Sequence, residues 1–133
     1  MNKRRVIEVP GLHHANPIPL ATRIGNLLVS GSIWGAGEDL ESQCEGMFGN
    51  IRRIMEAAGG STDDIIRLTV WLRDISDKNA LNREWLRMFP DEESRPARRT
   101  AGDPNMAGGR LVQCEIMAVV GSSGAVVGTD AVS

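Results

Sequence analysis

The sequence predicts an α+β fold in which two helices pack on one face of a mostly antiparallel sheet of about six strands. In two segments, apolar residues recur at three- and four-residue steps, which is the spacing of one helical face. Other segments alternate apolar and polar residues, as strands do. These segments follow one another as strands, helix, strand, helix, strands. Because each helix has a single apolar stripe, we expect both helices on the same face of one sheet.

The chain is expected to form one domain with a short tail. It has 133 residues, 41% of them hydrophobic and 24% charged, which are ordinary values for a globular domain. The final segment, GSSGAVVGTDAVS, consists of small residues and is of low complexity. We therefore expect a folded domain over residues 1–120 and a tail over residues 121–133.

Charge and hydropathy argue against several kinds of partner. The formal net charge is −2, whereas nucleic-acid-binding domains are usually basic. No apolar run has the length that crosses a bilayer, and the N-terminal residues MNKRRVIEVPG lack the apolar region of a secretory leader. The sequence predicts a cytoplasmic protein with neither nucleic-acid nor membrane partners.

Metal and cofactor chemistry is not indicated by the residues present. Cys44 and Cys114 are the only cysteines, and their spacing fits no metal site. The two histidines are adjacent, and P-loop and GxGxxG motifs are absent. The only lysines, Lys3 and Lys78, lie in the N-terminal tail and beside a turn-like segment, so no Schiff-base lysine is expected. We expect neither a metal nor an organic cofactor.

The N-terminal part is expected to contribute strands. Val6, Ile7 and Val9 are suited to a short strand. The segment IGNLLVSGSIW, residues 24–34, predicts a strand that leaves a tight turn at Gly25 and Asn26. The residues just before this turn are expected to complete a hairpin.

Two helices are predicted from their apolar stripes. Asp39 is the expected N-cap of the first helix, and the Gly-Gly pair at residues 59–60 is its expected stop. The second helix is expected from residue 76 or 77 to residue 88, because Pro90 limits it. The first stripe consists of Leu40, Cys44, Met47, Phe48, Ile51, Ile54, Met55 and Ala58, and the second of Leu81, Trp85 and Met88.

Three further strands are expected in the second half of the chain. They cover residues 65–73, residues 96–101 and residues 111–120, and a glycine-rich loop joins the last two. In the first of them the alternation places one set of residues toward the helices and the other set away from them. The two sets are Ile66, Leu68, Val70 and Leu72, and Arg67, Thr69, Trp71 and Arg73.

The last strand is apolar on both faces, with one exception. One face carries Val112, Cys114, Ile116, Ala118 and Val120, which suits the side covered by helices. The other face is also mostly apolar but has Glu115 at its centre. Because both helices are used on the first face, self-association is the economical way to cover the second. Glu115 would then lie in a cleft between subunits, where a carboxylate needs a partner or a function.

An arginine cluster in SRPARRT offers a partner for that glutamate. Arg98 and Arg99 are adjacent in a predicted strand, so they point to opposite faces, and only one of them can share the cleft of Glu115. An arginine there can bind a substrate carboxylate in a bidentate pair. The residues alone leave two interpretations equally open, a structural ion pair or a binding site.

The chain resembles the Rid family, the reactive intermediate deaminases, also called the YjgF family. Four segments carry the resemblance, in the order and spacing of the family, between residues 16 and 120. They are IGNLLVSGSI, NIRRIMEAAGGSTDDIIRLTVWLRD, SRPARRT and VQCEIMAVV.

The resemblance implies a fold, an assembly and an activity. Rid proteins have a chorismate-mutase-like α+β fold and are homotrimers with clefts between neighbouring subunits. Deaminase members hydrolyse enamines and imines of small 2-amino acids to 2-keto acids and ammonia, with no metal and no organic cofactor. A small carboxylate-bearing substrate is therefore expected.

The resemblance also assigns residues to this site. Arg98 matches the arginine that binds the substrate carboxylate, and Glu115 matches the glutamate that positions the attacking water. Ser30 and Gly31 match the serine-glycine pair of the pocket, and Asn82 matches an asparagine of the second helix.

The sequence departs from the family at several positions. Ile18 stands where many deaminase members have a pocket tyrosine, and Arg99 stands where a serine or cysteine often follows the family arginine. Trp34 either lines a larger pocket or packs at a subunit interface, and packing is the favoured interpretation. His14, like its neighbour His13, either replaces the missing hydroxyl group or is a loop residue.

Two functions follow from these residues. The first is a metal-free enamine or imine deaminase with an arginine clamp and a glutamate-activated water. The alternative is a non-catalytic trimer that binds small carboxylates or keto acids. RNA cleavage is the least favoured function, because the chain is mildly acidic and has no tyrosine for base stacking.

Overall fold

The computed structural model describes residues 3–121, so the expected tail lies, apart from Gly121, outside the described residues. One sheet of six strands has the order β1-β2-β3-β6-β4-β5. All neighbouring strands pair antiparallel except β4 and β5, which are parallel. The expectation of a mostly antiparallel sheet is therefore confirmed. The strands are β1 (Arg5–Ile7), β2 (Ala21–Ile24), β3 (Leu27–Ser30), β4 (Ile65–Leu72), β5 (Ala97–Gly102) and β6 (Val112–Val119).

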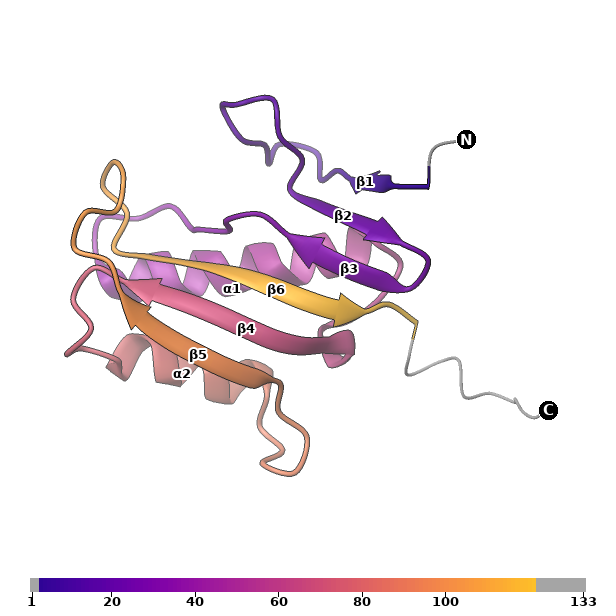
Figure 1. Cartoon of the computed structure of the whole chain (residues 1–133). Coiled ribbons are helices and arrows are strands. Elements are labelled where there is room, and N and C mark those ends of the chain that lie inside the picture. Colours follow the sequence, from indigo (N-terminus) through magenta and orange to yellow (C-terminus); the bar gives the residue numbers. More distant parts are fainter. Residues whose placement is uncertain (1–2, 122–133) are drawn as a thin grey trace.

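Both helices lie on the same face of this sheet, as expected (Figure 1). Helix α1 (Leu40–Ala57) follows β3, and α2 (Asn79–Met88) connects β4 to the parallel strand β5. Asp39 caps α1, because its carboxylate accepts a hydrogen bond from the backbone N–H of Ser42 at 2.8 Å. A short 3₁₀ turn (Thr62–Asp64) leads from α1 into β4. No helix in residues 3–121 is both long and apolar enough to cross a membrane.

The hairpin forms where the sequence predicted it. Ile24 pairs with Leu27, which leaves Gly25 and Asn26 as the two turn residues. Gly25 has a φ of +56°, a conformation that glycine adopts without steric cost. The turn therefore fixes the register of β2 against β3.

One facing assignment in β4 is wrong. A β-bulge at Ile65–Arg67 shifts the register against β6. Ile65 turns into the core at 5% exposure, and Ile66 is 48% exposed. Beyond the bulge the expected alternation holds, and Leu68, Val70 and Leu72 are buried against the helices. The bulge adds one residue to the strand, and a strand pattern with period two cannot reveal such an insertion.

The two cysteines are core residues. Cys44 lies on α1 and Cys114 on the helix-covered face of β6, and both are fully buried free thiols. Burial raises the pKa of Cys44 to about 12 and also raises the pKa of Cys114.

We predict that neither thiol reacts readily in the native protein. The thiolate is the reactive form, and a raised pKa leaves almost none of it at pH 8. A disulfide-exchange reagent should label both cysteines at least about 100-fold more slowly in buffer than in strong denaturant. Fast labelling of both residues in the folded protein would show that these burial assignments are incorrect.

Gly35 allows the segment after β3 to lie directly on α1. A Cβ atom at Gly35 would meet the α1 backbone, at 2.6 Å from both the carbonyl oxygen of Gln43 and the carbonyl carbon of Gly46. Gly49 lies within α1 itself, and a Cβ atom there would meet nothing within 4 Å. Close backbone contact of this kind excludes any side chain.

We predict opposite effects from two glycine-to-alanine changes. Gly35→Ala should lower the free energy of unfolding by about 3 kcal/mol, at the upper end of the range for overpacked sites. Gly49→Ala, the matched control, should raise it by about 0.5–1 kcal/mol, because alanine is the better helix former. Urea unfolding measures both values, and equal values for the two variants would contradict the close packing at Gly35.

Candidate active site

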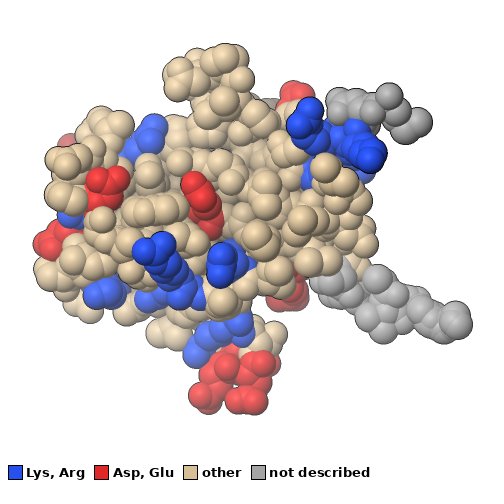
Figure 2. Space-filling model, in the orientation of Figure 1, with Lys and Arg blue, Asp and Glu red and all other residues tan. Residues whose placement is uncertain are grey.

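Glu115 lies at the centre of the sheet face that no helix covers. Its strand neighbour across the ladder is Thr69 of β4, and Thr69 in turn pairs with Arg99 of β5. Paired residues share a face, so these three side chains project from the same side of the sheet. Figure 2 shows this face, with one acidic side chain near its middle and basic side chains close by. Glu115 is exposed in the protomer, as the strand pattern predicted.

The rest of this open face is largely apolar. Met117 and Val119 follow Glu115 along β6, and strands β1, β2 and β3 extend the apolar surface beyond them. The most exposed residues of this patch are Val6 (54%), Ile24 (53%), Leu27 (50%) and Val29 (44%). Contiguous apolar surface of this kind is typical of an interface.

The arginine that shares the face of Glu115 is Arg99 and not Arg98. Arg98 pairs in register with Leu68, which is buried beneath the helices, so Arg98 projects toward α2. Within one protomer, Arg98 and Glu115 therefore lie on opposite faces of the sheet. Strand β4 also separates the two residues, so Glu115 is two strand spacings away, on the order of 10 Å. One small substrate cannot touch both side chains of a single protomer.

Arg98 has the properties of an anion-binding residue. Its guanidinium lies 5.0 Å from the centre of the Trp85 ring, a cation–π contact with α2. Its Nη1 atom is buried and has no hydrogen-bond partner among residues 3–121. Burial lowers the pKa of Arg98, which is the mark of a cation that has lost water without gaining a counter-ion. Because β5 is the outer strand of the sheet, this group lies at an edge that another molecule can reach.

Asn82 is on α2, the helix whose Trp85 contacts Arg98. It is one helical turn from Trp85 and partly exposed. Residues three positions apart lie on the same side of a helix, so Asn82 flanks the ring that contacts Arg98. These residues make one half of the expected site, at the edge formed by β5 and α2.

Ser30 and Gly31 belong to a second group, at the end of β3. The backbone N–H of Ile116 donates to the Ser30 hydroxyl at 2.9 Å, and this hydroxyl donates to the carbonyl of Gly31 at 2.7 Å. The Gly31 N–H donates to the carbonyl of Leu20 at 3.0 Å. The Ser30 side chain therefore maintains the β3–β6 pairing where the regular ladder ends, one residue from Glu115.

The chain after Gly31 returns to β6 and brings Ser32 opposite Glu115 and Trp34 opposite Gln113. Ile33 forms an isolated bridge with Cys114, and the backbone N–H and C=O groups of these two residues bond each other at 2.7 and 2.9 Å. In this antiparallel register Ser32 lies opposite Glu115, on the open face. Ser32 was not predicted as a site residue. The Ser-Gly-Ser pattern was visible, but only the register shows which serine faces the glutamate.

His14 lies against the same segment. A Cβ atom on Gly31 would be 3.8 Å from its Nε2 atom, and its ring centre is 5.2 Å from that of Trp34. Its Nε2 is buried and has no hydrogen-bond partner in the part of the chain that the structure describes. Burial, and secondly the charge of Arg110, lower the pKa of His14, so the ring is neutral at pH 7.

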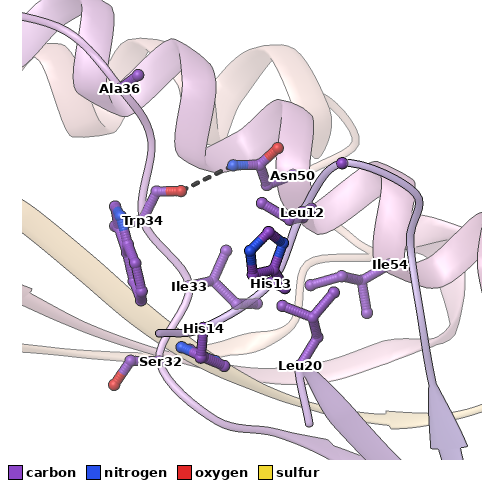
Figure 3. A pocket seen from close by; sticks show the side chains of 11 residues that line it. Leu12, His13, His14, Leu20, Ser32, Ile33, Trp34, Ala36, Asn50 and Ile54 are labelled. Atoms are coloured by element: carbon purple, nitrogen blue, oxygen red, sulfur yellow. Dashed lines mark hydrogen bonds between the residues drawn. The ribbon is translucent and has the colours of Figure 1, made fainter. Parts of the chain in front are cut away.

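A pocket of about 220 Å³ lies beside His14 and Trp34, between the N-terminal loop and α1 (Figure 3). Its walls are mainly apolar, and the amide of Asn50 donates to the carbonyl of Trp34 at 2.8 Å. Ile18 is elsewhere in the same loop, 54% exposed, and lines a separate hollow of the N-terminal segment. The pocket is lined by Gly11, Leu12, His13, His14, Leu20, Ser32, Ile33, Trp34, Ala36, Asn50 and Ile54.

The protomer therefore carries two separate sets of site residues. One set, Arg98 with Asn82, lies at the β5 edge and provides a cation without a counter-ion. The other set consists of Glu115 with Ser32 opposite it in the register, next to the segment of Gly31 that His14 contacts. The first set can bind a carboxylate, and the second can hold a water beside a carboxylate base.

Comparisons with known proteins agree with this fold. The family model described as Endoribonuclease L-PSP matches residues 17–120. A RutC family protein from Pyrococcus horikoshii is 32% identical over 104 residues, which cover 78% of this chain and 75% of the relative. A 2-iminobutanoate/2-iminopropanoate deaminase from Dermatophagoides farinae is 23% identical over 129 residues, which cover 90% of this chain and 99% of the relative.

Solved structures have the same fold. A YjgF family member from Mycobacterium tuberculosis aligns with a TM-score of 0.78 at 25% identity, over 88% of this chain and 99% of the other. A protein of the Rid family from Yersinia pestis aligns with a TM-score of 0.78 at 23% identity, again over 88% and 99%. By the family match and these relatives, the chain belongs to the Endoribonuclease L-PSP family, which is the YjgF or Rid family.

Proposed function

We propose that the protein hydrolyses the imine or enamine of a small 2-amino acid to the 2-keto acid and ammonia. The observation that carries this proposal is the buried Nη1 of Arg98, which has no hydrogen-bond partner in the described structure. A bound carboxylate would supply the missing partner and form a bidentate pair with the guanidinium. Relatives named as 2-iminobutanoate/2-iminopropanoate deaminases support the same chemistry.

The site that we propose is assembled from two protomers. Arg98 and Glu115 project from opposite faces of one sheet, so a substrate held by Arg98 would have to meet Glu115 of a neighbouring subunit. The exposed apolar face around Glu115 gives subunits a reason to associate. Association would also exclude water from the site and strengthen the pair between Arg98 and the substrate.

The proposed reaction is hydrolysis of a C=N bond. The Glu115 carboxylate accepts a proton from water as the water oxygen bonds to the imine carbon. The proton then passes to nitrogen, which gives a carbinolamine. The hydroxyl proton of the carbinolamine is transferred to the same nitrogen, the C–N bond breaks, and ammonia leaves as the C=O group of the keto acid forms. The imine carbon is already electrophilic, so positioning by Arg98 and Glu115 supplies the main effect. In this proposal the Ser32 hydroxyl orients the water, and the Asn82 amide orients the substrate.

The assembly gives a prediction of its own. We expect a homotrimer at micromolar concentration, because the apolar residues of β1, β2 and β3 are otherwise in water. Leu27→Glu places a charge in this patch and should shift the protein toward monomer, whereas Glu56→Gln on the exposed side of α1 should not. Light scattering with size-exclusion chromatography measures the mass. A monomeric wild-type protein would contradict the shared site.

An ammonia-release assay tests the activity. Imines are generated in situ by amino-acid oxidases, with catalase present, and the rate is compared with uncatalysed hydrolysis. The protein should accelerate the release of ammonia from at least one 2-imino acid. Binding of keto acids, followed by thermal shift, distinguishes the alternative function, since a non-catalytic carboxylate-binding trimer would be stabilised by keto acids and show no acceleration.

A further inference from the structure

Arg110 is a second cation beside the Glu115 face. It lies just before β6, and its guanidinium carbon is 3.6 Å from the centre of the Trp34 ring. One of its nitrogens, Nη1, donates to Oε1 of Gln113 at 3.2 Å. This stacked geometry keeps the guanidinium plane fixed while N–H groups remain free to bind another group.

Arg110 has no carboxylate partner in residues 3–121. The two ion pairs of this part of the chain join Arg83 to Glu41 and Arg87 to Glu84, both on the helices. Arg110 is nevertheless partly buried, and a hollow of about 300 Å³ adjoins it, between the glycine-rich loop and the segment after β3. A partly desolvated cation with adjacent space is suited to bind an anionic ligand.

The loop that carries Arg110 is held in place by a second arginine. The Arg73 guanidinium donates to the carbonyls of Pro104, Met106, Gly108 and Arg110, at 2.6–3.2 Å. Gln43, which is 4% exposed, accepts from the N–H of Leu111 at 2.8 Å and donates to the carbonyl of Gly109 at 3.0 Å. These bonds preorganise the position of Arg110, so binding a ligand there requires little rearrangement.

Arg110 is also close to Glu115. Gln113, which it contacts, is two residues before Glu115 on the same face of β6, about 6.6 Å along the strand. Trp34 lies opposite Gln113 in the same register that places Ser32 opposite Glu115. Gln113 therefore links the Arg110 guanidinium to the face of β6 on which the proposed base lies.

We propose that Arg110 binds a second acidic group of the substrate, so that the preferred substrates are 2-imino dicarboxylates. The inference rests on the proposed deaminase function and adds a substrate class to it. The 2-carboxylate pairs with Arg98 of one subunit, and the distal carboxylate pairs with Arg110 beside Glu115 of the next. A monocarboxylate such as 2-iminobutanoate leaves Arg110 without a counter-ion.

The test compares substrates in the wild-type protein and in two variants of Arg110. Ammonia release is measured from 2-iminosuccinate, 2-iminoglutarate, 2-iminopropanoate and 2-iminobutanoate. We expect the wild type to favour the dicarboxylates by at least about tenfold in kcat/KM, the value of one charge-assisted pair. Arg110→Gln should remove this preference and change the rate with 2-iminobutanoate less than about threefold. Arg110→Lys should keep part of the preference, and Arg52→Gln, on the exposed side of α1, is the control.

The comparison of substrates in the wild-type protein needs no variant, so this part of the test can be carried out even if Arg110→Gln fails to fold. A preference for monocarboxylates, or an unchanged preference in a folded Arg110→Gln protein, would overturn the proposal. If no imine is hydrolysed, the deaminase proposal fails. Calorimetry of keto-acid binding then tests separately whether Arg110 binds a second carboxylate. Tighter binding of 2-oxoglutarate than of 2-oxobutanoate, lost in Arg110→Gln, would support the second carboxylate site, and equal binding would refute it.

Discussion

Arg98→Ala is expected to abolish ligand binding and turnover together. The change removes the charged half of a sheltered carboxylate pair, which costs on the order of 1.5–3 kcal/mol, or more than tenfold in affinity. Arg98→Lys should restore only part of this affinity, because an ammonium group cannot form the bidentate fork. Calorimetry with 2-oxobutanoate and the ammonia-release assay measure the two effects.

Arg99→Ala is the matched comparison, since Arg99 is the next residue in β5 and projects from the other face. We expect this variant to stay within a few-fold of the wild type in both assays. If Arg99 proves essential and Arg98 dispensable, the carboxylate is bound on the open face, and the assignment of Arg98 is incorrect. Circular dichroism of both variants checks that they fold.

Glu115→Gln is expected to separate binding from catalysis. Glutamine keeps the shape of the side chain and one acceptor oxygen but cannot accept the proton of the attacking water. Turnover should fall by about 10²-fold or more, whereas binding of 2-oxobutanoate should change only a few-fold. Single-turnover rates and calorimetry on the same preparation measure the two quantities.

Glu56→Gln is the control, because it makes the same chemical change on the exposed side of α1. Both of its values should match those of the wild type. Full deaminase activity in Glu115→Gln would show that another group activates the water. The open-face position of Ser32 makes Ser32→Ala the next variant to examine in that case.

The order and type of the elements could be predicted from local sequence patterns. The stripe of α1, its Asp39 cap and the turn at Gly25 and Asn26 depend on residues close together in the chain, and each was found where the pattern placed it. Helix α2 begins at Asn79, later than the expected residue 76 or 77. Its N-cap residue, Lys78, makes no side-chain cap bond, and Asp77 instead accepts a hydrogen bond from the N–H of Asn79 at 3.3 Å.

The composition of the site could be predicted only in part. The pattern of the last strand singled out Glu115, and the resemblance singled out Arg98, but Ser32, Arg73, Arg110 and Gln43 were not identified. Gln43 is a buried polar residue on the apolar side of α1, and its partners lie at residues 37, 109 and 111. Contacts between residues so far apart in the chain produce no periodic pattern in the sequence, so they could not be predicted from it.

What the sequence determined by itself was the set of helices and strands and the two faces of the last strand, because these depend on local periodicity and on local turn and cap residues. Only the tertiary structure decided which of Arg98 and Arg99 faces Glu115, and that Ile65, not Ile66, enters the core. The alternation of apolar and polar residues shows that neighbouring side chains in a strand point to opposite faces of the sheet. Which face each side chain points to is set by the pairing register with the next strand. A bulge reverses the assignments on one side of it, as at Ile65 and Ile66, and a one-residue shift in the register reverses those of the whole strand.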